Sequence, residues 1–382
     1  MSLRAYSLFH LIEFTGMFNL LRKKNKKKKF KVAVGISGGV DSAVTAALLK
    51  EQGYEVIGVH LYCYDEGPYC TAQEDRASAV RVAEHLGIPL KVWDLRKQYK
   101  DKVISYFFSE YKAGRTPNPD VMCNREIKFG LFLEKALKEL KVDYIATGHY
   151  AQIKHSKEGL KLLRGEDSTK DQSYFLYTLG QKQLEHILFP IGELTKKKVR
   201  EEAKKLNLPN KSRPDSQGIC FIGPVNVSQF LRENLAAKKG PVLTSEGQVI
   251  GEHDGVWFFT EGQRHGFRVF KTGLPLYVIS KDVKANTLVV GRGLESQIKD
   301  FSVENLSFIN SRYKTLILAG RMRVRIRHLG ELLPAKIRKL KGSKLLVELA
   351  RPVSGVAPGQ SAVFYQGVEV LGGGVISKTV NL

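Results

Sequence analysis

Three short segments of the chain combine residue types and spacings that could do chemistry. The first is Ser37-Gly38-Gly39-Val40-Asp41-Ser42, which follows an apolar, strand-like run and precedes a helical pattern. Two glycines let the backbone approach an anion closely, and the hydroxyls of Ser37 and Ser42 can add hydrogen-bond donors. The start of a helix adds unpaired N–H groups. The segment, called the phosphate loop below, therefore predicts a phosphate-binding site.

Asp41 narrows the kind of phosphate ligand. The loop lacks the Lys of the Walker motif and the spacing of the dinucleotide fingerprint. A carboxylate beside phosphates requires a cation between them, so Asp41 points to Mg²⁺. A plain strand-to-helix turn is the alternative interpretation, but a strand before and a helix after the loop favour phosphate binding.

The other two segments each carry a cysteine in a polar, turn-rich context. Asp120 precedes Cys123 by three residues where the chain enters a helix, and Cys220 lies in a loop. A thiol near a helix N-terminus is expected to have a lowered pKa, which suits a nucleophile, although each Cys could also be a small buried hydrophobe. We read Cys63 and Cys70 as bystanders and expect reduced thiols with no metal site. An iron–sulfur cluster that adds either of them to Cys123 and Cys220 is a remote alternative.

The elements that must position these residues follow from hydrophobic periodicity. Strand-like runs alternate with helical patterns up to residue 146, which predicts a parallel sheet covered on both faces. Farther on, we expect a hairpin, a long helix and then β structure in one or two small barrels. The expected strands are 31–36, 55–62, 90–93 and 144–146, then 150–153 paired with 160–163, and 256–260, 287–290, 324–327 and 345–349. The expected helices are 42–52, 71–85, a helix through 127–140, and 181–208.

Composition limits the class of protein. The chain has 382 residues, 43% of them hydrophobic and 26% charged, which excludes a disordered or fibrous protein. Its 61 Lys and Arg residues outnumber 38 Asp and Glu residues, giving a net charge of +23. The surplus persists outside the Lys-rich N-terminus. Such a surplus favours a polyanionic partner, nucleic acid first and an anionic membrane second.

The first thirty residues are excluded from the fold prediction. An apolar stretch over 6–21 precedes a run of Lys and Arg, and Glu13 interrupts it. The stretch is shorter than the ~20 residues of a spanning helix and lacks the order of a secretory signal. We expect a flexible basic extension or a start site placed too early, with Met17 as the true start. A helix on a membrane surface is left open.

Several segments, in collinear order from about Lys31 to the C-terminus, resemble the bacterial tRNA-specific 2-thiouridylases, a family of the ATP pyrophosphatases. The segments are the phosphate loop, 114–120, 123–124, 146–150, 170–175, 218–223 and 358–365. Gln217, the N-terminal extension and the weakly matching Arg325-Ile326 depart from the family pattern.

The resemblance implies a fold and a domain order. We expect an α/β fold, with a doubly wound parallel sheet of the adenine nucleotide alpha hydrolase type, then a small, mostly helical domain and a C-terminal β-barrel region. The expected boundaries are 1–30 for the extension, 31–168 for the ATP-binding domain, 169–240 for the central domain with Cys220, and 241–382 for the β region.

The resemblance also implies a reaction. ATP adenylates the C2 oxygen of the wobble uridine of tRNA for Lys, Glu and Gln, and a cysteine persulfide delivers sulfur, with release of AMP and pyrophosphate. Cys220 would hold the persulfide, Cys123 would resolve it as a disulfide, and Asp120 would be the general acid/base. Uridine C2 becomes accessible when the base is flipped out.

Binding residues carry over from the same motifs. The residues expected at ATP are Gly35, Ile36, Ser37, Gly38, Gly39, Val40, Asp41, Ser42, Leu61 and Gly148. Those expected at the target base are Asn118, Pro119 and Asp120. Those expected at the rest of the tRNA are His149, Lys170, Asp171, Gln172, Arg325, Ile326 and Gln360.

Partners and alternatives complete the expectations. The resemblance implies tRNA, ATP and a sulfur donor, either a cysteine desulfurase or a relay protein, and Asp41 indicates Mg²⁺. The reduced cysteines indicate the cytoplasm, and we expect a monomer that is not an integral membrane protein. Two other functions are left open. One is a small-molecule synthetase of the argininosuccinate type, which would not need the cysteines. The other is a non-catalytic RNA-binding protein with a relic nucleotide site.

Overall fold

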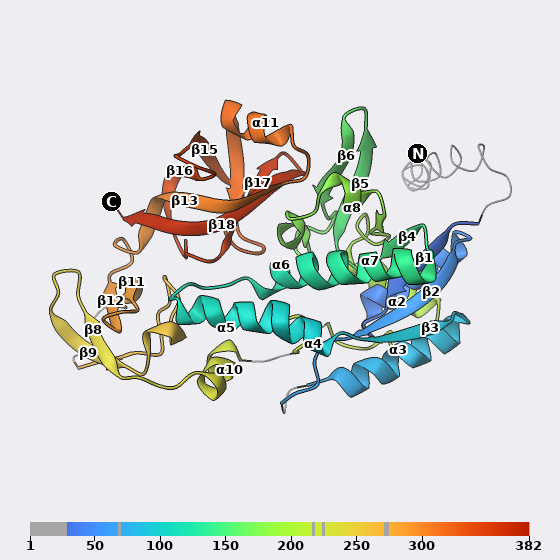
Figure 1. Ribbon diagram of the computed structural model, residues 1–382, viewed down its shortest axis with the longest axis horizontal. Coiled ribbons are helices and arrows are strands. Elements are labelled where there is room, and N and C mark those ends of the chain that lie inside the picture. The colour runs from blue at the N-terminus through green and yellow to red at the C-terminus, as the bar shows by residue number, and fades with distance from the viewer. Residues whose placement is uncertain (1–28, 68–69, 216–217, 224–225, 271–274, 382) are drawn as a thin grey trace, which may run out of the picture.

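The computed structural model describes residues 29–67, 70–215, 218–223, 226–270 and 275–381. Nearly all of the expected N-terminal extension lies outside the described residues, as do Ser216 and Gln217. The chain forms a parallel-sheet domain, a small β domain and a barrel, with two long helical rods running between them (Figure 1). The expected fold class is confirmed.

The parallel sheet is the centre of the first domain. Its strand order is β3 (Leu90–Asp94), β2 (Glu55–Tyr62), β1 (Lys31–Gly35), β4 (Tyr144–Ala146) and β7 (Ile187–Leu188), and every neighbouring pair is parallel. The three middle residues of β1 are fully buried apolar side chains. A strand that is apolar on both faces is typical of a sheet covered by helices on both sides.

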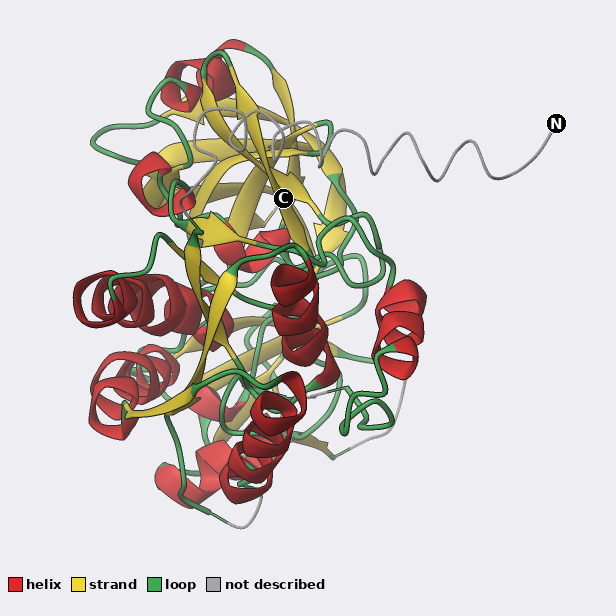
Figure 2. Ribbon diagram, turned by 90° about the vertical axis from the view of Figure 1, so that its right-hand side faces the viewer, coloured by secondary structure: helices red, strands yellow, loops and turns green. Residues whose placement is uncertain are grey.

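Helices cover both faces of this sheet (Figure 2). They include α2 (Val40–Glu51), α3 (Ala72–Leu86) and α9 (Lys196–Lys205). Helix α3 buries Ala79, Val82 and Ala83, which lie on one face at helical spacing, and Gly87 ends it in a left-handed conformation with φ 58°. Thr195 begins α9, because its side chain accepts a hydrogen bond from the N–H of Lys198.

Two helical rods follow β3 and lie side by side (Figure 1). The first contains α4 (Arg96–Tyr99), the wide-turn helix η1 (Lys100–Ile104) and α5 (Ser105–Lys112). The second contains α6 (Pro119–Cys123), the wide-turn helix η2 (Asn124–Phe132), α7 (Leu133–Lys135) and η3 (Ala136–Leu140). Asn118 caps the second rod by accepting from the N–H of Val121 at 3.2 Å, and Pro119 takes the first helical position.

The single helix expected over 181–208 is wrong. The segment contains α8 (Gln181–Leu184), strand β7 and then α9. Pro190 and Gly192 interrupt the helical pattern between them, and an added side-chain carbon at Gly192 would lie 1.8 Å from the carbonyl oxygen of Ala151. Strand β7 adds a fifth strand to the sheet by pairing Ile187 with Ile145.

A five-stranded sheet forms the small β domain. Along the chain it comes after η4 (Ser173–Leu176) and α10 (Val227–Asn234). Its strand order is β10 (Arg268–Val269), β9 (Val249–His253), β8 (Gly240–Leu243), β12 (Thr287–Gly291) and β11 (Tyr277–Asp282). The strand expected over 256–260 is wrong: η5 (Val256–Phe258) is a short 3-10 helix. Gly255, with φ 152°, turns the chain there, and Asn286 accepts from the N–H of Val256.

The last part of the chain closes into a six-stranded barrel. Its elements are β13 (Gln297–Phe308), α11 (Tyr313–Ala319), β14 (Arg321–Arg325), β15 (Leu333–Lys339), β16 (Leu345–Ser354), β17 (Ser361–Gln366) and β18 (Glu369–Asn381), and β13 pairs with β18 to close it. The expected strand at 324–327 is displaced toward the N-terminus. Strand β18 also pairs with β6 (Gly159–Arg164) of the β5 (Ala151–Ser156) hairpin. In the part of the chain that the structure describes, no helix has the length and apolar character to cross a bilayer.

Candidate active site

The phosphate loop is a tight turn between β1 and α2. Gly38 has φ 89°, and a side-chain carbon there would lie 2.5 Å from the carbonyl oxygen of Asp75, so only Gly fits. Ser42 Oγ accepts from the N–H of Ser37 at 3.2 Å and donates to the carbonyl of Gly39 at 3.0 Å. These bonds hold the loop around the N-terminus of α2, where backbone N–H groups can receive an anion.

Neighbouring strand ends complete the expected nucleotide site. Gly148 follows β4, and a side-chain carbon there would lie 2.8 Å from the carbonyl carbon of Asp41 and 2.9 Å from the amide nitrogen of Ser42. Leu61 and Ile36 are buried at the carboxyl ends of β2 and β1. The structure therefore brings the expected ATP residues to one edge of the sheet, which is where doubly wound folds bind ligands.

Lys196 is a residue at this site that the sequence analysis missed. Its ammonium lies 2.7 Å from Asp41 Oδ1 and 2.8 Å from Asp215 Oδ1. Tyr150 also donates to Asp41 Oδ1, at 2.9 Å, and Lys170 lies 2.7 Å from Asp215 Oδ2. The available signal was the run of three Lys residues at a capped helix start, which we did not connect to the loop.

Asp41 is the carboxylate of the phosphate loop that could bind Mg²⁺. In the described ranges, no group of three or more His, Cys, Asp or Glu side chains is arranged to hold a metal ion. Mg²⁺ commonly takes one or two protein carboxylates and completes its shell with water and substrate phosphates. Asp41 fits this pattern as a single carboxylate beside a phosphate-binding loop.

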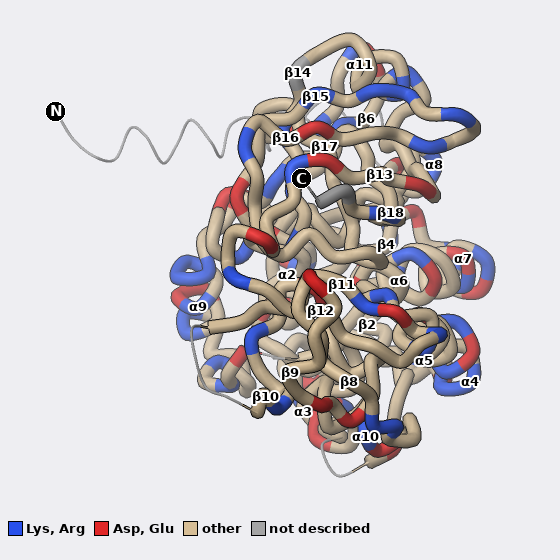
Figure 3. The backbone as a smooth tube through the Cα atoms, turned by 90° about the vertical axis from the view of Figure 1, so that its left-hand side faces the viewer, with Lys and Arg blue, Asp and Glu red and all other residues tan. Residues whose placement is uncertain are grey.

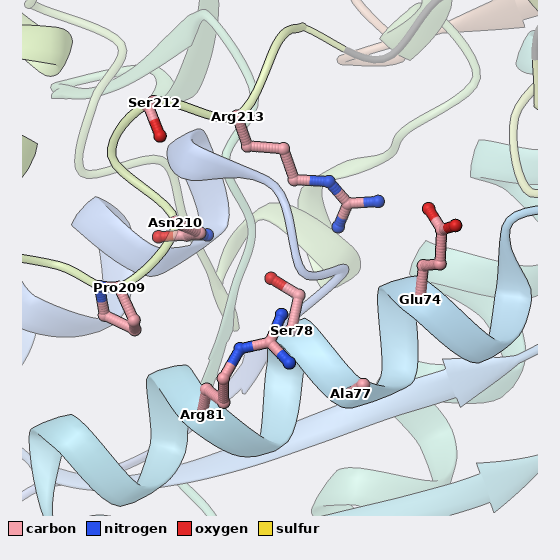
Figure 4. Close-up of a pocket in the computed structure, with 8 residues that line it drawn as sticks. All are labelled: Glu74, Ala77, Ser78, Arg81, Pro209, Asn210, Ser212 and Arg213. Carbon is pink, nitrogen blue, oxygen red and sulfur yellow. The ribbon is translucent and has the colours of Figure 1, made fainter.

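A pocket of about 330 Å³ lies on the α3 side of the phosphate loop (Figure 4). Ser78 and Asn210 line it, and both donate to the carbonyl of Gly38 at 2.8 Å. Arg213 also lines it and pairs with Asp75 at 2.5 Å, while Arg81 approaches from α3. The pocket walls thus support the loop from behind.

The two cysteines that the sequence singled out meet in the structure. Cys123, at the end of α6, has its Sγ 3.7 Å from the Sγ of Cys220. The N–H of Cys220 donates to Asp120 Oδ1 at 3.2 Å, and Tyr99 donates to the carbonyl of Cys220 at 2.6 Å. Phe221, with φ 68°, turns the chain directly after Cys220. Residues separated by about a hundred positions therefore form one cluster.

The two thiols differ in their pKa. Burial, and then the hydrogen bond to Cys220, raise the pKa of Cys123 well above its ordinary value. The hydrogen bond from Cys123 lowers the pKa of Cys220, and Lys128 contributes in the same direction. The expected low pKa of Cys123 is therefore wrong, because complete burial outweighs any effect of the short helix α6. Cys220 is the more readily ionised thiol.

The remaining cysteines differ in position. Cys63 is buried directly after β2. Burial raises the pKa of Cys63, and the nearby Cys220 raises it further. Its place puts the thiol pair beyond the carboxyl end of β2, the sheet edge that also carries Leu61 and the phosphate loop. Cys70 instead contacts the carbonyl of Tyr64 and the start of α3. The described residues thus give no support to a four-cysteine cluster.

The barrel touches the segment that precedes α6. Gln360 donates to the carbonyls of Thr116 and Pro117, both at 3.0 Å, and the N–H of Thr116 donates to the carbonyl of Pro358 at 2.7 Å. Gln360, expected at tRNA, therefore holds the residues next to Asn118 and Pro119, which were expected at the target base. This contact couples the barrel to the thiol cluster.

His149 and Gln172, also expected at tRNA, make internal contacts. His149 is buried, with its Nδ1 2.7 Å from Thr147 Oγ1 and its ring packed against those of Phe129 and Phe189. Burial lowers its pKa well below the ordinary value, so the imidazole is neutral at pH 7. Gln172 accepts from the N–H of Tyr150 at 3.0 Å.

Asp171, Arg325 and Ile326 are core residues. Asp171 is fully buried and bonded to Arg164 and Arg325, and Ile326 is 4% exposed. Direct contact of these three with a ligand would require the surrounding structure to open. Exposed basic residues lie elsewhere, on α9 and along β15 and its neighbours (Figure 3).

Family models match almost the whole described chain. Residues 30–224 match the tRNA methyl transferase HUP domain, residues 228–292 its PRC-barrel domain, and residues 298–376 the aminomethyltransferase beta-barrel domain. The three matches follow one another in the order of the three bodies described above.

Curated relatives are similar over nearly their full length. The tRNA-specific 2-thiouridylase of Lysinibacillus sphaericus is 44% identical over 94% of this chain and 97% of its own. Those of Bacillus pumilus and Listeria monocytogenes are 46% and 47% identical, each over 91% of this chain and 94% of their own. A solved 4-thiouridine synthetase–RNA complex with bound ATP is 20% identical over 51% of this chain and 46% of its own, with a TM-score of 0.34.

Proposed function

The chain belongs to the tRNA-specific 2-thiouridylase family, and from this premise we propose that it is an ATP-dependent tRNA-uridine 2-sulfurtransferase. The observation that carries the proposal is the thiol pair, with Sγ atoms 3.7 Å apart beside Asp120. Cys63, which neighbours Cys220, follows β2, and the phosphate loop follows β1, the neighbouring strand of the same sheet.

The phosphate loop binds and orients ATP in this proposal. The N–H groups at the start of α2 and the hydroxyls of Ser37 and Ser42 hold the phosphates, and Lys196 adds a positive charge beside Asp41. Mg²⁺ bound by Asp41 and the phosphates would offset the charge of the leaving pyrophosphate. The C2 oxygen of the target uridine attacks the α-phosphate, and the base becomes adenylated as pyrophosphate leaves.

Sulfur transfer then uses both cysteines. A donor protein first converts Cys220 to a persulfide, and the terminal sulfur attacks C2 of the adenylated base, so that AMP leaves with the oxygen. The Cys123 thiol attacks Cys220 Sγ and forms the Cys123–Cys220 disulfide, and its proton passes to the departing 2-thiouridine. The disulfide contains the two oxidising equivalents that the persulfide brought, and a thiol reductant restores the pair.

Asp120 serves as general acid/base in this scheme. Burial raises its pKa above the ordinary carboxyl value, and Lys128 and the N–H of Cys220 act in the opposite direction. A raised pKa lets a carboxyl group accept a proton from the base and return it near neutral pH. Its bond to the N–H of Cys220 holds it beside the reacting sulfur.

Recognition of tRNA divides between direct and indirect residues. Asn118 and Pro119 meet the flipped-out base, and Lys170 and the exposed basic residues of α9 and β15 contact phosphates. Asp171, Gln172, His149, Arg325, Ile326 and Gln360 act by positioning the surfaces that meet tRNA. We place the reaction in the cytoplasm, on tRNA for Lys, Glu and Gln, with a monomeric enzyme and a cysteine desulfurase or relay protein as donor.

Nucleoside mass spectrometry tests the proposal. Unmodified tRNA is incubated with the protein, ATP, Mg²⁺, cysteine and a cysteine desulfurase, beside the Cys220→Ser and Cys123→Ser variants and a Cys70→Ser control. We expect the wobble uridine to exchange oxygen for sulfur with wild type and Cys70→Ser, and with neither site variant. If ATP is cleaved but the tRNA gains no sulfur, the proposal that tRNA uridine is the acceptor is wrong.

Two other group transfers predict different products in the same assay. A small-molecule synthetase would release AMP and pyrophosphate without tRNA and would not respond to either Cys→Ser change. Methyl transfer, which the description of the HUP family model names, would need a methyl donor and would add carbon to the nucleoside. The adjacent thiols and the near full-length thiouridylase relatives favour sulfur transfer.

A further inference from the structure

Lys128 is a charged residue at the thiol cluster that the reaction scheme leaves without a role of its own. It lies in η2, five residues after Cys123, and a wide-turn helix bonds each residue to the fifth one along the chain. Its Nζ is 5.7 Å from the ring centroid of Phe221, the residue after Cys220. The side chain is half-buried, and its charge lowers the pKa of the Cys220 thiol.

Lys128 faces acidic groups from several elements. Asp120 and Cys123 approach from α6, Cys220 from the loop before Phe221, and Cys63 from the end of β2. His149, after β4, is close enough for Lys128 to lower its pKa further. Tyr99 also borders the thiols, and its own pKa is raised. Lys128 is thus a cation placed among groups that become negative when they lose a proton.

The balance of charges explains why a Lys is stable in this position. Burial alone would lower the pKa of Lys128, but Cys220 and Cys123 together raise it above the ordinary value. The ammonium therefore stays charged at neutral pH. A fixed positive charge in a partly desolvated site stabilises a nearby thiolate more than the same charge does in water.

On the basis of this geometry we propose that Lys128 holds Cys220 as a thiolate at neutral pH, ready to take up sulfur and to keep its persulfide anionic. The inference rests on the proposed function for the use of Cys220, but the ionisation of the thiol can be measured without tRNA or ATP. Lys128 lies over the ring of Phe221, next to Cys220, and acts on the thiol through its charge, whereas Tyr99 binds the backbone carbonyl of Cys220.

The test measures alkylation of Cys220 by iodoacetamide across pH in the reduced full-length protein, read on the Cys220 peptide by mass spectrometry. Lys128→Met removes the charge at similar length, and Lys128→Arg keeps it. Lys135→Met is the matched control, because Lys135 lies on the same rod over Trp93 and pairs with Glu139. We expect Lys128→Met to raise the alkylation midpoint by at least about one pH unit, with Lys128→Arg and Lys135→Met near wild type.

A midpoint in Lys128→Met that equals the wild-type value would overturn the inference. If Lys128→Met does not fold by circular dichroism, Lys128→Gln carries the same expectation. Failure here can be separated from failure of the proposed function. If the alkylation midpoint shifts in Lys128→Met but the wild-type protein does not thiolate tRNA, the role of Lys128 stands and tRNA uridine is rejected as the acceptor. Wild-type thiolation with an unshifted midpoint keeps the function and rejects the role of Lys128.

Discussion

The guanidinium of Arg325 lies 2.8 Å from Asp171 Oδ2, and both side chains are almost completely buried. Arg325 belongs to β14 of the barrel, whereas Asp171 follows the β5–β6 hairpin of the first domain. Asp171 also accepts from Arg164 Nε at 2.9 Å and from the N–H groups of Gly165 and Ser173. One carboxylate therefore joins two domains.

Replacing Asp171 by Asn is expected to destabilise the protein by about 3–5 kcal/mol, because it leaves the buried charge of Arg325 uncompensated. Urea unfolding followed by circular dichroism measures the change. Glu331→Gln is the control, since the Glu331–Arg351 pair is exposed and its loss is expected to cost under about 1 kcal/mol. Equal losses for the two variants would contradict a special role of the buried pair.

The same pair predicts a pH dependence. Burial alone would raise the pKa of Asp171, but the bonds from Arg164, Ser173 and Arg325 outweigh it and lower the pKa. A carboxyl with a lowered folded pKa stabilises the protein above its unfolded value of about 3.9, and this is lost as pH falls through the folded value. The stability gap between wild type and Asp171→Asn is therefore expected to narrow below about pH 4. A gap that stays constant down to acid pH would argue against an ionised Asp171.

Lys196→Met is expected to raise the KM for ATP about 10- to 100-fold, the effect of losing one charge-assisted hydrogen bond to phosphate. The change also leaves Asp41 and Asp215 without the ammonium between them. The KM for ATP is measured from the steady-state rate of pyrophosphate release. Lys197→Met is the control, because Lys197 is the exposed next residue of the same helix. Similar values of KM for both variants would exclude Lys196 from phosphate binding.

Gly148→Ala is expected to weaken ATP binding at least about tenfold, because the new methyl group would press on the backbone of Asp41 and Ser42 at the start of α2. Isothermal titration with a non-hydrolysable ATP analogue measures the affinity. Gly180→Ala serves as control, since the nearest atom to its added carbon is 3.9 Å away. Unchanged affinity would mean that α2 moves without cost to the nucleotide site.

Mild oxidation with diamide is expected to link Cys123 to Cys220, since their Sγ atoms are already 3.7 Å apart and a disulfide needs about 2.05 Å. Peptide mapping without reductant identifies the linked pair. Cys63→Ser should still form the bond, because Cys63 lies outside the pair. A dominant Cys63–Cys220 link would mean that another thiol resolves the persulfide.

The sequence was most informative where local patterns decide structure. Strands β2 and β4 begin and end where their apolar runs predict, and the phosphate loop lies between β1 and α2. The Cys123–Cys220 pairing followed only from the family resemblance, because nothing local connects residues so far apart. The lowered pKa expected for Cys123 was wrong, since that pKa depends on burial that only the tertiary structure reveals.

Contacts between residues that are distant in the sequence could not be predicted for the same reason. Lys128 and Lys196 look like ordinary helical lysines in the sequence, and each meets its acidic partners only after folding. The resemblance implied tRNA contacts for Asp171 and Arg325, and the structure adds what the sequence could not predict, namely that both side chains are buried in one ion pair. Strand β7 is two residues long, too short for any periodic signal.

The pairing of β18 with β6 also sets an order of assembly during synthesis. Glu369 and Val370 of β18 pair with Leu163 and Leu162 of β6. The ribosome must therefore add about 200 residues after β6 before β18 is made, which takes about 10–40 s at typical elongation rates. Through that interval the hairpin presents an open strand edge, a surface that invites pairing with other chains. A nascent chain that stops before the last strand would keep this open edge.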